Sequence, residues 1–360
     1  MVVKIKRITG LWALHRDIIK CKSKYYYNFI TMAYKFHLPF IFLWLITTQL
    51  HAQQHPIPVI LDTDIAGDYD DVGAMALLHA FADKGEAKIL AVISSNAFET
   101  TVPTISVLNT YFKKPHIPIG VTKRAKPNEL CQQQWAQAII AKYPHNIRAN
   151  QQATEAVALY RRILAQQPDH SVTLITIGFF TNLADLLNSK ADQYSALTGR
   201  QLVKQKIKQL VAMATSLAPG KTSGREYNVY IDAAASQRAF AQWETPVILS
   251  PFEVGEQVRT GIPLIKNNAI HNSPVKDAFQ IALTKDKDTI GRMSWDQTAV
   301  FAAVRGIQPW FKTREVNLRI EKDGTNTLIP GNRFTLLELT DQATALQKAI
   351  EELMHHQPAH

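Results

Sequence analysis

Cysteine is scarce in this sequence. The 360 residues contain two cysteines, Cys21 and Cys131, so a framework of disulfide bonds is excluded as the source of stability. No basic or histidine-rich sequence surrounds Cys131, and an activated thiol is therefore not indicated. With 46% hydrophobic and 19% charged residues, the chain instead has the composition of a globular protein with one large or two small α/β domains.

A strong charge of one sign is also lacking outside the N-terminal segment. The formal net charge is +10, but the first 52 residues hold eight Lys or Arg and one acid and so contribute +7 of it. The rest of the chain carries only about +3, which is not the electrostatic footprint of a nucleic-acid-binding protein. We therefore predict a small-molecule ligand and no nucleic-acid partner.

The sequence has no long hydrophobic run near its N-terminus. After Met32 and Lys35, an apolar stretch covers only residues 38–46, well short of the roughly 20 residues that a membrane span requires. A polar step then ends at Ala52, and no cysteine follows it closely to accept a lipid. This pattern predicts a signal peptide that starts at Met32 and is cleaved after Ala52, with residues 1–31 as an upstream extension. The mature protein is then secreted or periplasmic, without a stable membrane span; a retained N-terminal anchor is the alternative.

Beyond residue 55, short apolar runs rich in β-branched residues alternate with longer helical patterns. Continuous rather than alternating apolarity is typical of strands that are buried on both faces. We expect strands at 59–61, 88–94, 117–121, 172–177, 207–212 and 247–250, and helices at 71–81, 101–112, 155–167, 181–188, 232–243 and 296–304. The fold class predicted is α/β, with an open, mostly parallel sheet and helices on both faces. No linker or repeat divides residues 56–345, so residues 53–360 are expected to form a single catalytic domain.

Five carboxylates follow the first predicted strand in "ILDTDIAGDYDDVGAMALL". They are Asp62, Asp64, Asp68, Asp70 and Asp71. Ligands of open α/β sheets bind beyond the carboxyl ends of the strands, so the acids lie in the usual place for a site. Carboxylates this close raise one another's pKa and destabilise the fold unless a cation neutralises them. Oxygen ligands at irregular spacing suit Ca²⁺ or Mg²⁺ rather than Zn²⁺.

Three other interpretations of the acidic segment compete with such a site. The spacing of the acids approaches that of an EF-hand loop. However, Ala66 and Gly73 occupy two of the ligand positions, and the segment follows a strand, which an EF-hand loop does not. A metal-dependent phosphatase of the haloacid dehalogenase type also begins with a strand and Asp-x-Asp, although it usually has Thr or Val where this chain has Ala66. A merely solvated acidic loop does not explain why the acids adjoin a buried strand.

Several motifs occur together and in one order. "DTDIAGDYDD" is followed by "AVISSN", "ITIGFFTNLADLL", "LVAMA", "REYNVYIDAAA" and "SWDQTAV", all between residues 57 and 304. In this set the chain resembles the nucleoside hydrolases of the inosine-uridine-preferring type. The first motif has a turn about two residues longer than the commonest form of that family, which leaves Asp68 as an extra acid without a role.

The resemblance implies Ca²⁺-dependent hydrolysis of the N-glycosidic bond of ribonucleosides to ribose and free base. The metal ligands it implies are Asp62, Asp71, Asp296 and the backbone carbonyl of Thr181, with Asp64 as the general base that activates water. Asp70, Asn96 and Asn228 would bind ribose hydroxyls, and Glu226 and Met213 would face the 5′ side. Carboxylates around the ribose suit this chemistry because bond cleavage builds positive charge on the sugar ring.

Two departures from the family pattern bear on the substrate. Many relatives carry His before the late Asp, whereas this chain has Trp295, which resembles the purine-preferring members in which an indole stacks on the base. The loop "TSLAPGKTSG" lacks the Asn that relatives place near the 5′ hydroxyl. We therefore predict a purine-preferring enzyme of nucleoside salvage, and an exported nucleoside- or sugar-binding protein without turnover is the main rival. The sequence is also compatible with a homo-oligomer.

Single residues also allow simpler interpretations. Asn182 and Asp232 follow the pattern of helix caps rather than ligands. Trp135, a candidate for a second indole in the site, is better explained by packing. Glu226 and Asn228, two residues apart, would face the same side if they lie on a strand.

Overall fold

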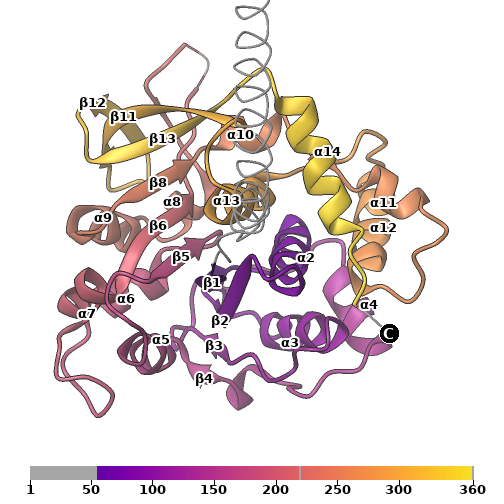
Figure 1. Ribbon diagram of the computed structural model, residues 1–360, viewed down its shortest axis with the longest axis horizontal. Helices are drawn as coiled ribbons and strands as arrows, with labels where there is room; N and C mark the ends of the chain where they lie inside the picture. The colour runs from indigo at the N-terminus through magenta and orange to yellow at the C-terminus, as the bar shows by residue number, and fades with distance from the viewer. Residues whose placement is uncertain (1–54, 219, 359–360) are drawn as a thin grey trace, which may run out of the picture. The chain divides into compact units, whose positions relative to one another are not determined.

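The computed structural model describes residues 55–218 and 220–358 of the chain (Figure 1). Contacts divide the chain into residues 1–54 and residues 55–360, and every described residue belongs to the second unit. The predicted signal peptide, its start at Met32 and its cleavage after Ala52 lie outside the described residues. Among the helices of the described part of the chain, none combines the length and the apolar character needed to cross a membrane.

An 11-stranded sheet forms the centre of the second unit. Its strand order is β4-β3-β2-β1-β5-β6-β8-β13-β11-β12-β7. The strands are β1 (Ile57–Thr63), β2 (Ala87–Ser94), β3 (Ile119–Val121), β4 (Thr154–Glu155), β5 (Val172–Thr176), β6 (Ile207–Met213), β7 (Ser223–Gly224), β8 (Val247–Ser250), β11 (Phe311–Ile320), β12 (Asn326–Pro330) and β13 (Phe334–Leu339). A separate two-stranded ribbon joins β9 (Arg259–Thr260) to β10 (Arg292–Met293).

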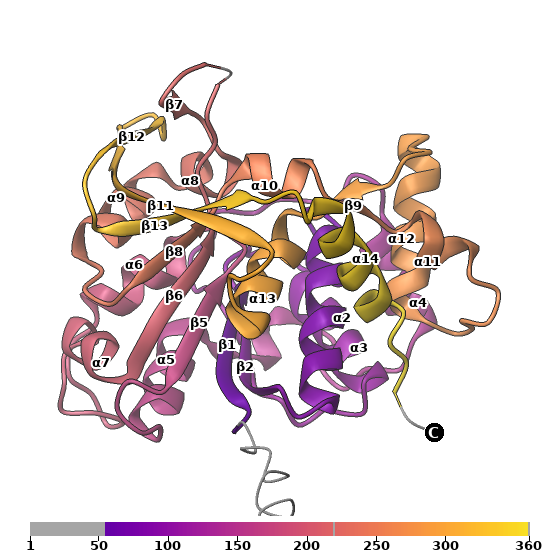
Figure 2. The same ribbon diagram turned by 45° about the horizontal axis from the view of Figure 1, so that its top comes forward.

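The strand order reverses next to β1. From β1 the chain adds β2, β3 and β4 on one side, then crosses to place β5, β6 and β8 on the other, and all these neighbours pair in parallel. Figure 2 shows β1, β5, β6 and β8 side by side. Such a reversal opens a crevice at the carboxyl ends of the two central strands, here β1 and β5, which is where open α/β sheets bind ligands.

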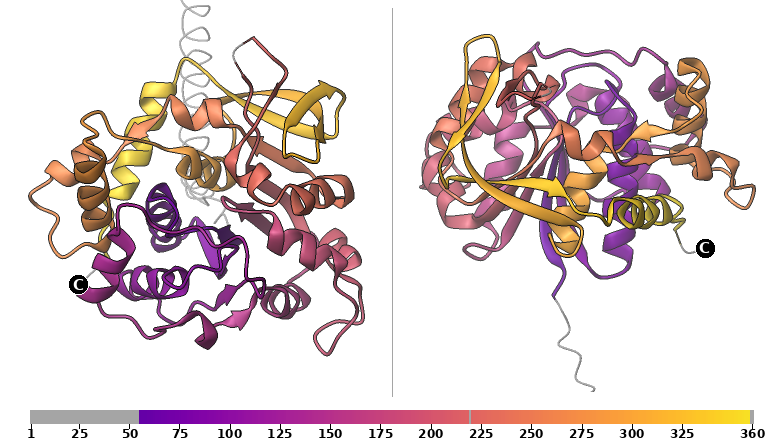
Figure 3. Two further views of the ribbon diagram at one scale, coloured as in Figure 1. Left: turned by 180° about the vertical axis from the view of Figure 1, so that it is seen from behind. Right: turned by 90° about the horizontal axis from the view of Figure 1, so that it is seen from above.

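Helices cover both faces of the sheet. On one face lie α2 (Asp70–Asp83), α3 (Thr101–Tyr111), α4 (Trp135–Lys142), α12 (Pro274–Asp286), α13 (Trp295–Arg305) and α14 (Ala343–Met354), and on the other α5 (Ala156–Ala165), α6 (Thr181–Asn188), α7 (Gly199–Lys206) and α9 (Ala233–Gln242). Shorter helices are η1 (Asn150–Gln152), α8 (Tyr227–Ile231), α10 (Phe252–Glu256) and α11 (Ile262–Lys266). In Figure 3 the yellow α14 lies between α2 and the orange pair α11 and α12.

Successive residues of β1 pack into two different cores. Val59 and Leu61 belong to the core under α2 and α13, whereas Ile60 belongs to the core under α5 and α6, and all three are fully buried. Burial on both faces is the reason that the strand reads as a continuous apolar run rather than an alternating one. The predicted fold class, an open and mostly parallel sheet with helices on both faces, is confirmed.

The part of the chain beyond residue 304 departs from the sequence-based expectation. The predicted strands and helices up to residue 304 are present with small shifts at their ends. No strand was predicted beyond that point, but β11, β12 and β13 extend the sheet there, with β11 antiparallel to both β12 and β13. Lys312, Thr313, Arg314 and Glu315 are all exposed on β11, so this strand lacks the continuous apolar run that marks the central strands.

A close approach of two backbones fixes the end of β1. A Cβ atom added to Gly178, just beyond β5, would lie 2.4 Å from the backbone nitrogen of Asp64 and 2.7 Å from the carbonyl carbon of Thr63. It would also lie 2.6 Å from Oγ of Ser95. Only glycine fits at position 178, and its close contact holds the backbone of Asp64 in place.

We expect Gly178→Ala to destabilise the protein by about 1 to 3 kcal/mol, the usual range for a side chain forced into a packed interior. The strain falls on backbone atoms, so a rotamer change cannot relieve it. Gly67→Ala is the matched control, because its added Cβ would meet its nearest neighbour at 3.7 Å. Chemical denaturation of the two variants and the wild-type protein measures the difference, and equal midpoints would contradict this account of the turn.

Candidate active site

A cavity of about 280 Å³ opens at the carboxyl ends of the central strands. Its walls come from the turn after β1, the ends of β5 and β6, and the starts of α2, α8, α10 and α13. The lining residues are Asp64, Gly67, Asp68, Asp70, Asp71, Ile177, Met213, Glu226, Tyr227, Asn228, Phe252, Arg292, Trp295 and Asp296. Segments separated by more than 200 residues in the sequence therefore meet around one space.

Three carboxylates come together at the floor of this cavity. Asp70, Asp71 and Asp296 each offer an oxygen atom, and these atoms lie within 4.8 Å of one another. The first two residues open α2, and Asp296 lies in the first turn of α13. Helix N-termini favour negative charge, which offsets part of the repulsion within the group.

Burial makes these carboxylates hard to ionise. The exposed fractions of Asp70, Asp71 and Asp296 are 3%, 1% and 4%. Burial raises the pKa of Asp70 to about 7, with the charge of Asp64 adding to the effect. The pKa values of Asp71 and Asp296 are also well above the ordinary range, first because of burial and second because of the neighbouring carboxylates.

Asp64 stands at the same edge, one residue past β1. Burial is the main cause that raises its pKa to about 8. Its charge also raises the pKa values of Asp70, Asp71 and Asp296, so all four carboxylates share one electrostatic field.

The residues fit a divalent cation. The cluster presents only carboxylate oxygens, the ligand type that hard cations such as Ca²⁺ and Mg²⁺ take. Each of its members is destabilised as an anion by burial and by nearby carboxylates. All three residues also line the cavity. The prediction of a metal site at this turn thus agrees with a buried aspartate cluster that can bind a metal.

Two of the predicted metal ligands, Asp62 and the backbone carbonyl of Thr181, stay predictions. Asp62 does not line the cavity; its Oδ2 accepts hydrogen bonds from Tyr160 Oη at 2.7 Å and from Asn182 Nδ2 at 3.0 Å. Thr181 is also absent from the cavity wall, and its hydroxyl donates to Asp232 at 2.8 Å. Both residues are fully buried, and Oδ1 of Asp62 has no hydrogen-bond partner among the described residues.

The predicted ribose contact of Asn96 stays a prediction, and the amide of this residue is held by the chain itself. Its Nδ2 donates to the carbonyl oxygens of Asp64 and Glu129 at 3.2 and 2.8 Å, and its Oδ1 accepts from the backbone of Phe98 and Glu129. An amide has two donors and one acceptor oxygen, so these bonds occupy the group. Asn96 is fully buried. Its single amide joins the loop that contains Asp64 to the loop that contains Glu129.

Glu226 and Asn228 line the cavity, but not from a strand as predicted. Glu226 caps α8 and accepts hydrogen bonds from the backbone nitrogens of Asn228 and Val229 at 2.9 and 3.0 Å. Capping by the Glu226 carboxylate starts a helix where alternation suggested a strand. Asn228 Nδ2 lies 3.3 Å from the sulfur of Met213, so all three residues meet on one wall. Burial raises the pKa of Glu226 to about 8.

The predicted helix caps and the second indole have mixed outcomes. Asp232 caps α9 by accepting from the backbone nitrogen of Ala235, which confirms its prediction. Asn182 lies inside α6, where it donates to Asp62 and to the Ser94 carbonyl, so its prediction as a cap is wrong. Trp135 is fully buried and takes no part in the cavity wall, as expected for packing.

Trp295 forms an aromatic end of the cavity. Its indole nitrogen donates to the Phe252 carbonyl at 3.0 Å, and its ring centroid lies 4.9 Å from that of Phe252. The guanidinium of Arg292 lies 4.8 Å from the centroid of the Trp295 ring. This end therefore combines apolar surface with a cation, next to the acidic floor.

Sequence reasoning missed the partner of Asp68. Arg292 forms an ion pair with Asp68 across 224 positions of the chain. It also missed Tyr227, whose hydroxyl donates to Glu129 at 2.9 Å, and Phe252. Asp68 was visible as an extra acid, and "GRMSWD" shows a cation three residues before the indole, but only the fold brings the two together.

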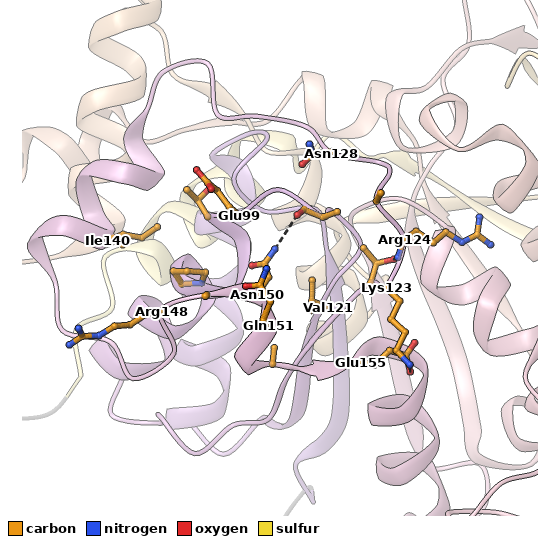
Figure 4. Close-up of a pocket in the computed structure, with 17 residues that line it drawn as sticks. Glu99, Val121, Lys123, Arg124, Asn128, Ile140, Arg148, Asn150, Gln151 and Glu155 are labelled. Carbon is orange, nitrogen blue, oxygen red and sulfur yellow. Dashed lines mark hydrogen bonds and ion pairs between the residues drawn. The ribbon is translucent and has the colours of Figure 1, made fainter.

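A larger cavity of about 720 Å³ lies near β3 and α3 (Figure 4). Its wall includes three cations, but Lys123 lies beside Glu155, with Nζ 3.9 Å from the carboxylate. Arg124 forms an ion pair with Asp185, and Figure 4 shows Arg148 directed away from the other labelled residues. No group of metal-ligating side chains among the described residues faces this space, so the smaller cavity is the candidate active site.

Comparison with curated proteins gives one relative with a stated activity. The chain is 28% identical over 214 residues to a pyrimidine-specific ribonucleoside hydrolase of Enterobacter sp. strain 638. The match covers 55% of this chain and 60% of that relative, so the chain spans less than two thirds of its length.

Solved structures share the fold. An inosine-uridine preferring nucleoside hydrolase from Bacillus anthracis matches with a TM-score of 0.62 at 18% identity, and a purine-preferring ribonucleoside hydrolase from Gardnerella vaginalis matches with 0.62 at 15%. An inosine-guanosine nucleoside hydrolase gives 0.65 at 18%. Each match covers 83% of this chain and 99% of the other.

The family to which the chain belongs is shown by its sequence. The sequence model of the inosine-uridine preferring nucleoside hydrolase family matches residues 59–348. This range includes every residue that lines the cavity and all the motifs from "DTDIAGDYDD" to "SWDQTAV". The resemblance predicted from those motifs is thereby confirmed. The chain belongs to the inosine-uridine preferring nucleoside hydrolase family.

Proposed function

We propose that this protein is a metal-dependent N-ribosyl hydrolase, which splits ribonucleosides into ribose and free base. The observation that carries the proposal is the cavity itself, in which four buried carboxylates face one space that ends at an indole ring. Such an arrangement suits a substrate with a polyhydroxyl sugar at one end and a flat base at the other. The family membership of the chain supports the same reaction.

The metal that we propose is Ca²⁺, held by Asp70, Asp71 and Asp296. Asp71 and Asp296 were predicted as ligands from the sequence, and Asp70, predicted as a ribose contact, joins them because its oxygen lies in the same cluster. When bound, such an ion lowers the pKa of water and neutralises the carboxylates around it. Asp62 and Thr181 would act from behind the cluster, by holding the turn and α6 in position.

Asp64 is the proposed general base. Its carboxylate lines the cavity beside the cluster, and its backbone is fixed by Asn96 and by the contact with Gly178. A base held this rigidly can take a proton from the attacking water without reorganisation of the chain. As the C–N bond breaks, positive charge grows on the ribose ring, and the surrounding carboxylates stabilise it.

The sugar is proposed to lie between the acidic floor and the wall formed by Met213, Glu226 and Asn228. Glu226 is held by two backbone hydrogen bonds, so its carboxylate has a defined direction. Asn228 offers its amide oxygen to a hydroxyl group on the same wall, since its Nδ2 donates to the carbonyl oxygens of Ile177 and Met213. This placement keeps the roles predicted for these three residues, with α8 rather than a strand carrying two of them.

The base is proposed to lie against Trp295, with purines preferred. Stacking of a base on an aromatic ring contributes about 1 to 3 kcal/mol and grows with the area of the base. The names of the relatives point in both directions, since one is pyrimidine-specific and another purine-preferring. The proposal therefore rests on the indole in this cavity.

Removal of the metal should abolish ribose release and lower the melting temperature. The reason is that the buried carboxylates regain their mutual repulsion when the cation leaves. Calcium restored at about 100 times its Kd should add about 2.7 kcal/mol to the free energy of unfolding. Ribose release from five ribonucleosides and differential scanning calorimetry, each with and without EGTA, measure the two effects; turnover that survives complete chelation would contradict the proposal.

Asp64→Asn separates an enzyme from a binding protein. Loss of the general base should lower kcat by about 10² to 10⁴ while nucleoside binding persists. Calorimetric titration with inosine gives the Kd, and a coupled ribose assay gives kcat. A wild-type protein that binds nucleosides without turnover, matched by an unchanged variant, would favour the exported receptor.

Trp295→Ala should reduce discrimination between purines and pyrimidines. Loss of stacking at about 1 to 3 kcal/mol corresponds to a drop of about 5- to 150-fold in kcat/KM for inosine, with uridine less affected. Trp295→Phe keeps an aromatic ring and should lie between the two proteins. An unchanged ratio of kcat/KM for inosine and uridine in Trp295→Ala would remove the indole from base selection.

A further inference from the structure

A tyrosine and a glutamate form a bridge at the rim of the cavity. Tyr227 is the first residue of α8 and lines the cavity. Its hydroxyl donates a hydrogen bond of 2.9 Å to Oε2 of Glu129, which lies 98 positions away in the loop between β3 and α4. In the chain this loop follows β3 and α8 follows β6, and these strands lie on opposite sides of β1 in the sheet. The bond therefore joins segments from the two sides of the reversal in strand order.

The backbone of Glu129 is fixed next to the turn after β1. The amide of Asn96 donates to the Glu129 carbonyl at 2.8 Å and accepts from the Glu129 backbone nitrogen at 2.9 Å. A Cβ atom added to Gly67 would lie 3.8 Å from the Cβ of Glu129. The carboxylate of Glu129 is thus carried by a rigid backbone, close to the segment that also carries Asp64.

The ring of Tyr227 needs such a partner to stay in place. Its side chain is 41% exposed, and exposed side chains change rotamer on the time scale of picoseconds to nanoseconds. The ring packs loosely, with centroids 6.0 Å from Phe179 and 5.5 Å from Tyr230. A hydrogen bond to an ionised carboxylate is stronger than one between neutral groups, so the bond to Glu129 restricts the ring to one direction.

We propose that Glu129 is a positioning residue that holds Tyr227 against the sugar end of the cavity, where the ring confines the ribose next to Asp64. The inference rests on the nucleoside hydrolase function proposed above. It assigns a role to the loop between β3 and α4, in which the sequence indicated no site residue. It also gives the amide of Asn96 a part in the site, because this amide holds the backbones of both Asp64 and Glu129.

The surroundings of Tyr227 place the bridge at the sugar end. In the sequence Tyr227 stands between Glu226 and Asn228, both of the proposed sugar wall, whereas Trp295 forms the opposite, aromatic end. Burial is the first cause that raises the pKa of Tyr227, followed by the bond to Glu129 and the charges of Glu129 and Asp64. The hydroxyl therefore stays protonated and donates to Glu129, within reach of the charge of the proposed base.

Tyr227→Phe keeps the ring and removes the bond. A contact made equally with the bound nucleoside and with the transition state changes KM and leaves kcat as it is. We expect KM to rise about 10-fold, the effect of one lost charge-assisted hydrogen bond, with kcat changed less than about 2-fold. The rise should be equal for inosine and uridine, because the two share the ribose. Steady-state ribose release with both substrates measures it, and a lower kcat without a higher KM, or a change confined to inosine, would overturn the proposal.

Two variants of Glu129 separate the bond from the charge. Glu129→Ala should raise KM as Tyr227→Phe does, whereas Glu129→Gln keeps an acceptor oxygen and should stay within about 3-fold of the wild-type KM. The double variant Tyr227→Phe/Glu129→Ala should be no worse than either single variant, since both remove the same bond. Additive losses, or a Glu129→Gln variant as impaired as Glu129→Ala, would overturn the bridge. If Tyr227→Phe does not fold, the two Glu129 variants decide the question.

Tyr230→Phe is the matched control. Tyr230 lies on the same helix and packs edge-to-face against Tyr227, but its hydroxyl has no hydrogen-bond partner among the described residues. This variant should leave KM and kcat unchanged for both substrates. A wild-type protein that releases no ribose fails the proposed function itself, whereas turnover with an unchanged KM in both Tyr227→Phe and Glu129→Ala fails only the positioning role.

Discussion

Repulsion between buried carboxylates is the constraint on which the rest of this structure depends. Asp64, Asp70, Asp71 and Asp296 are each less than a tenth exposed. The charges of Asp64, Asp70 and Asp71 each raise the pKa of at least one other member of this group. A fold that stabilised itself alone would replace them with apolar side chains of similar volume. Their presence makes the stability of the site conditional on positive charge from outside the chain.

Contacts from several parts of the fold hold the carboxylates of the cluster in fixed positions. Helices α2 and α13 direct their N-termini at it, Asn96 joins the loops beneath it, and Gly178 lets the backbone after β5 touch the turn after β1. Tyr160 and Asn182 hold Asp62 behind the cluster. Carboxylates that cannot move apart keep their geometry for a cation and a sugar, which is the arrangement that preorganised electrostatic catalysis requires.

Much of this could be predicted from the sequence, for identifiable reasons. The buried strand before Asp62 and the order of the motifs gave the parallel sheet, and the run of acids gave a metal-capable site at its edge. What could not be predicted is the direction of individual side chains. Asp62 and Asp64 are two residues apart in one motif, yet only Asp64 faces the cavity, since the strand ends between them. The amide of Asn96 serves two loop backbones, and the partner of Asp68 lies 224 residues away, so neither contact leaves a local signal.

The two cores that enclose β1 have a consequence for the time scale of motion at the site. Val59 and Leu61 are locked under α2 and α13, and Ile60 is locked under α5 and α6, so the strand cannot separate from one layer without opening the other. Segments enclosed in this way open only with the cooperative unit as a whole, while loops and termini open far more readily. Asp64 therefore directly follows a strand that opens only with the cooperative unit, and Arg292 reaches the same cavity from a two-stranded ribbon apart from the main sheet. The candidate site therefore joins a carboxylate that follows a strand enclosed by two cores to a cation carried by a separate, two-stranded ribbon.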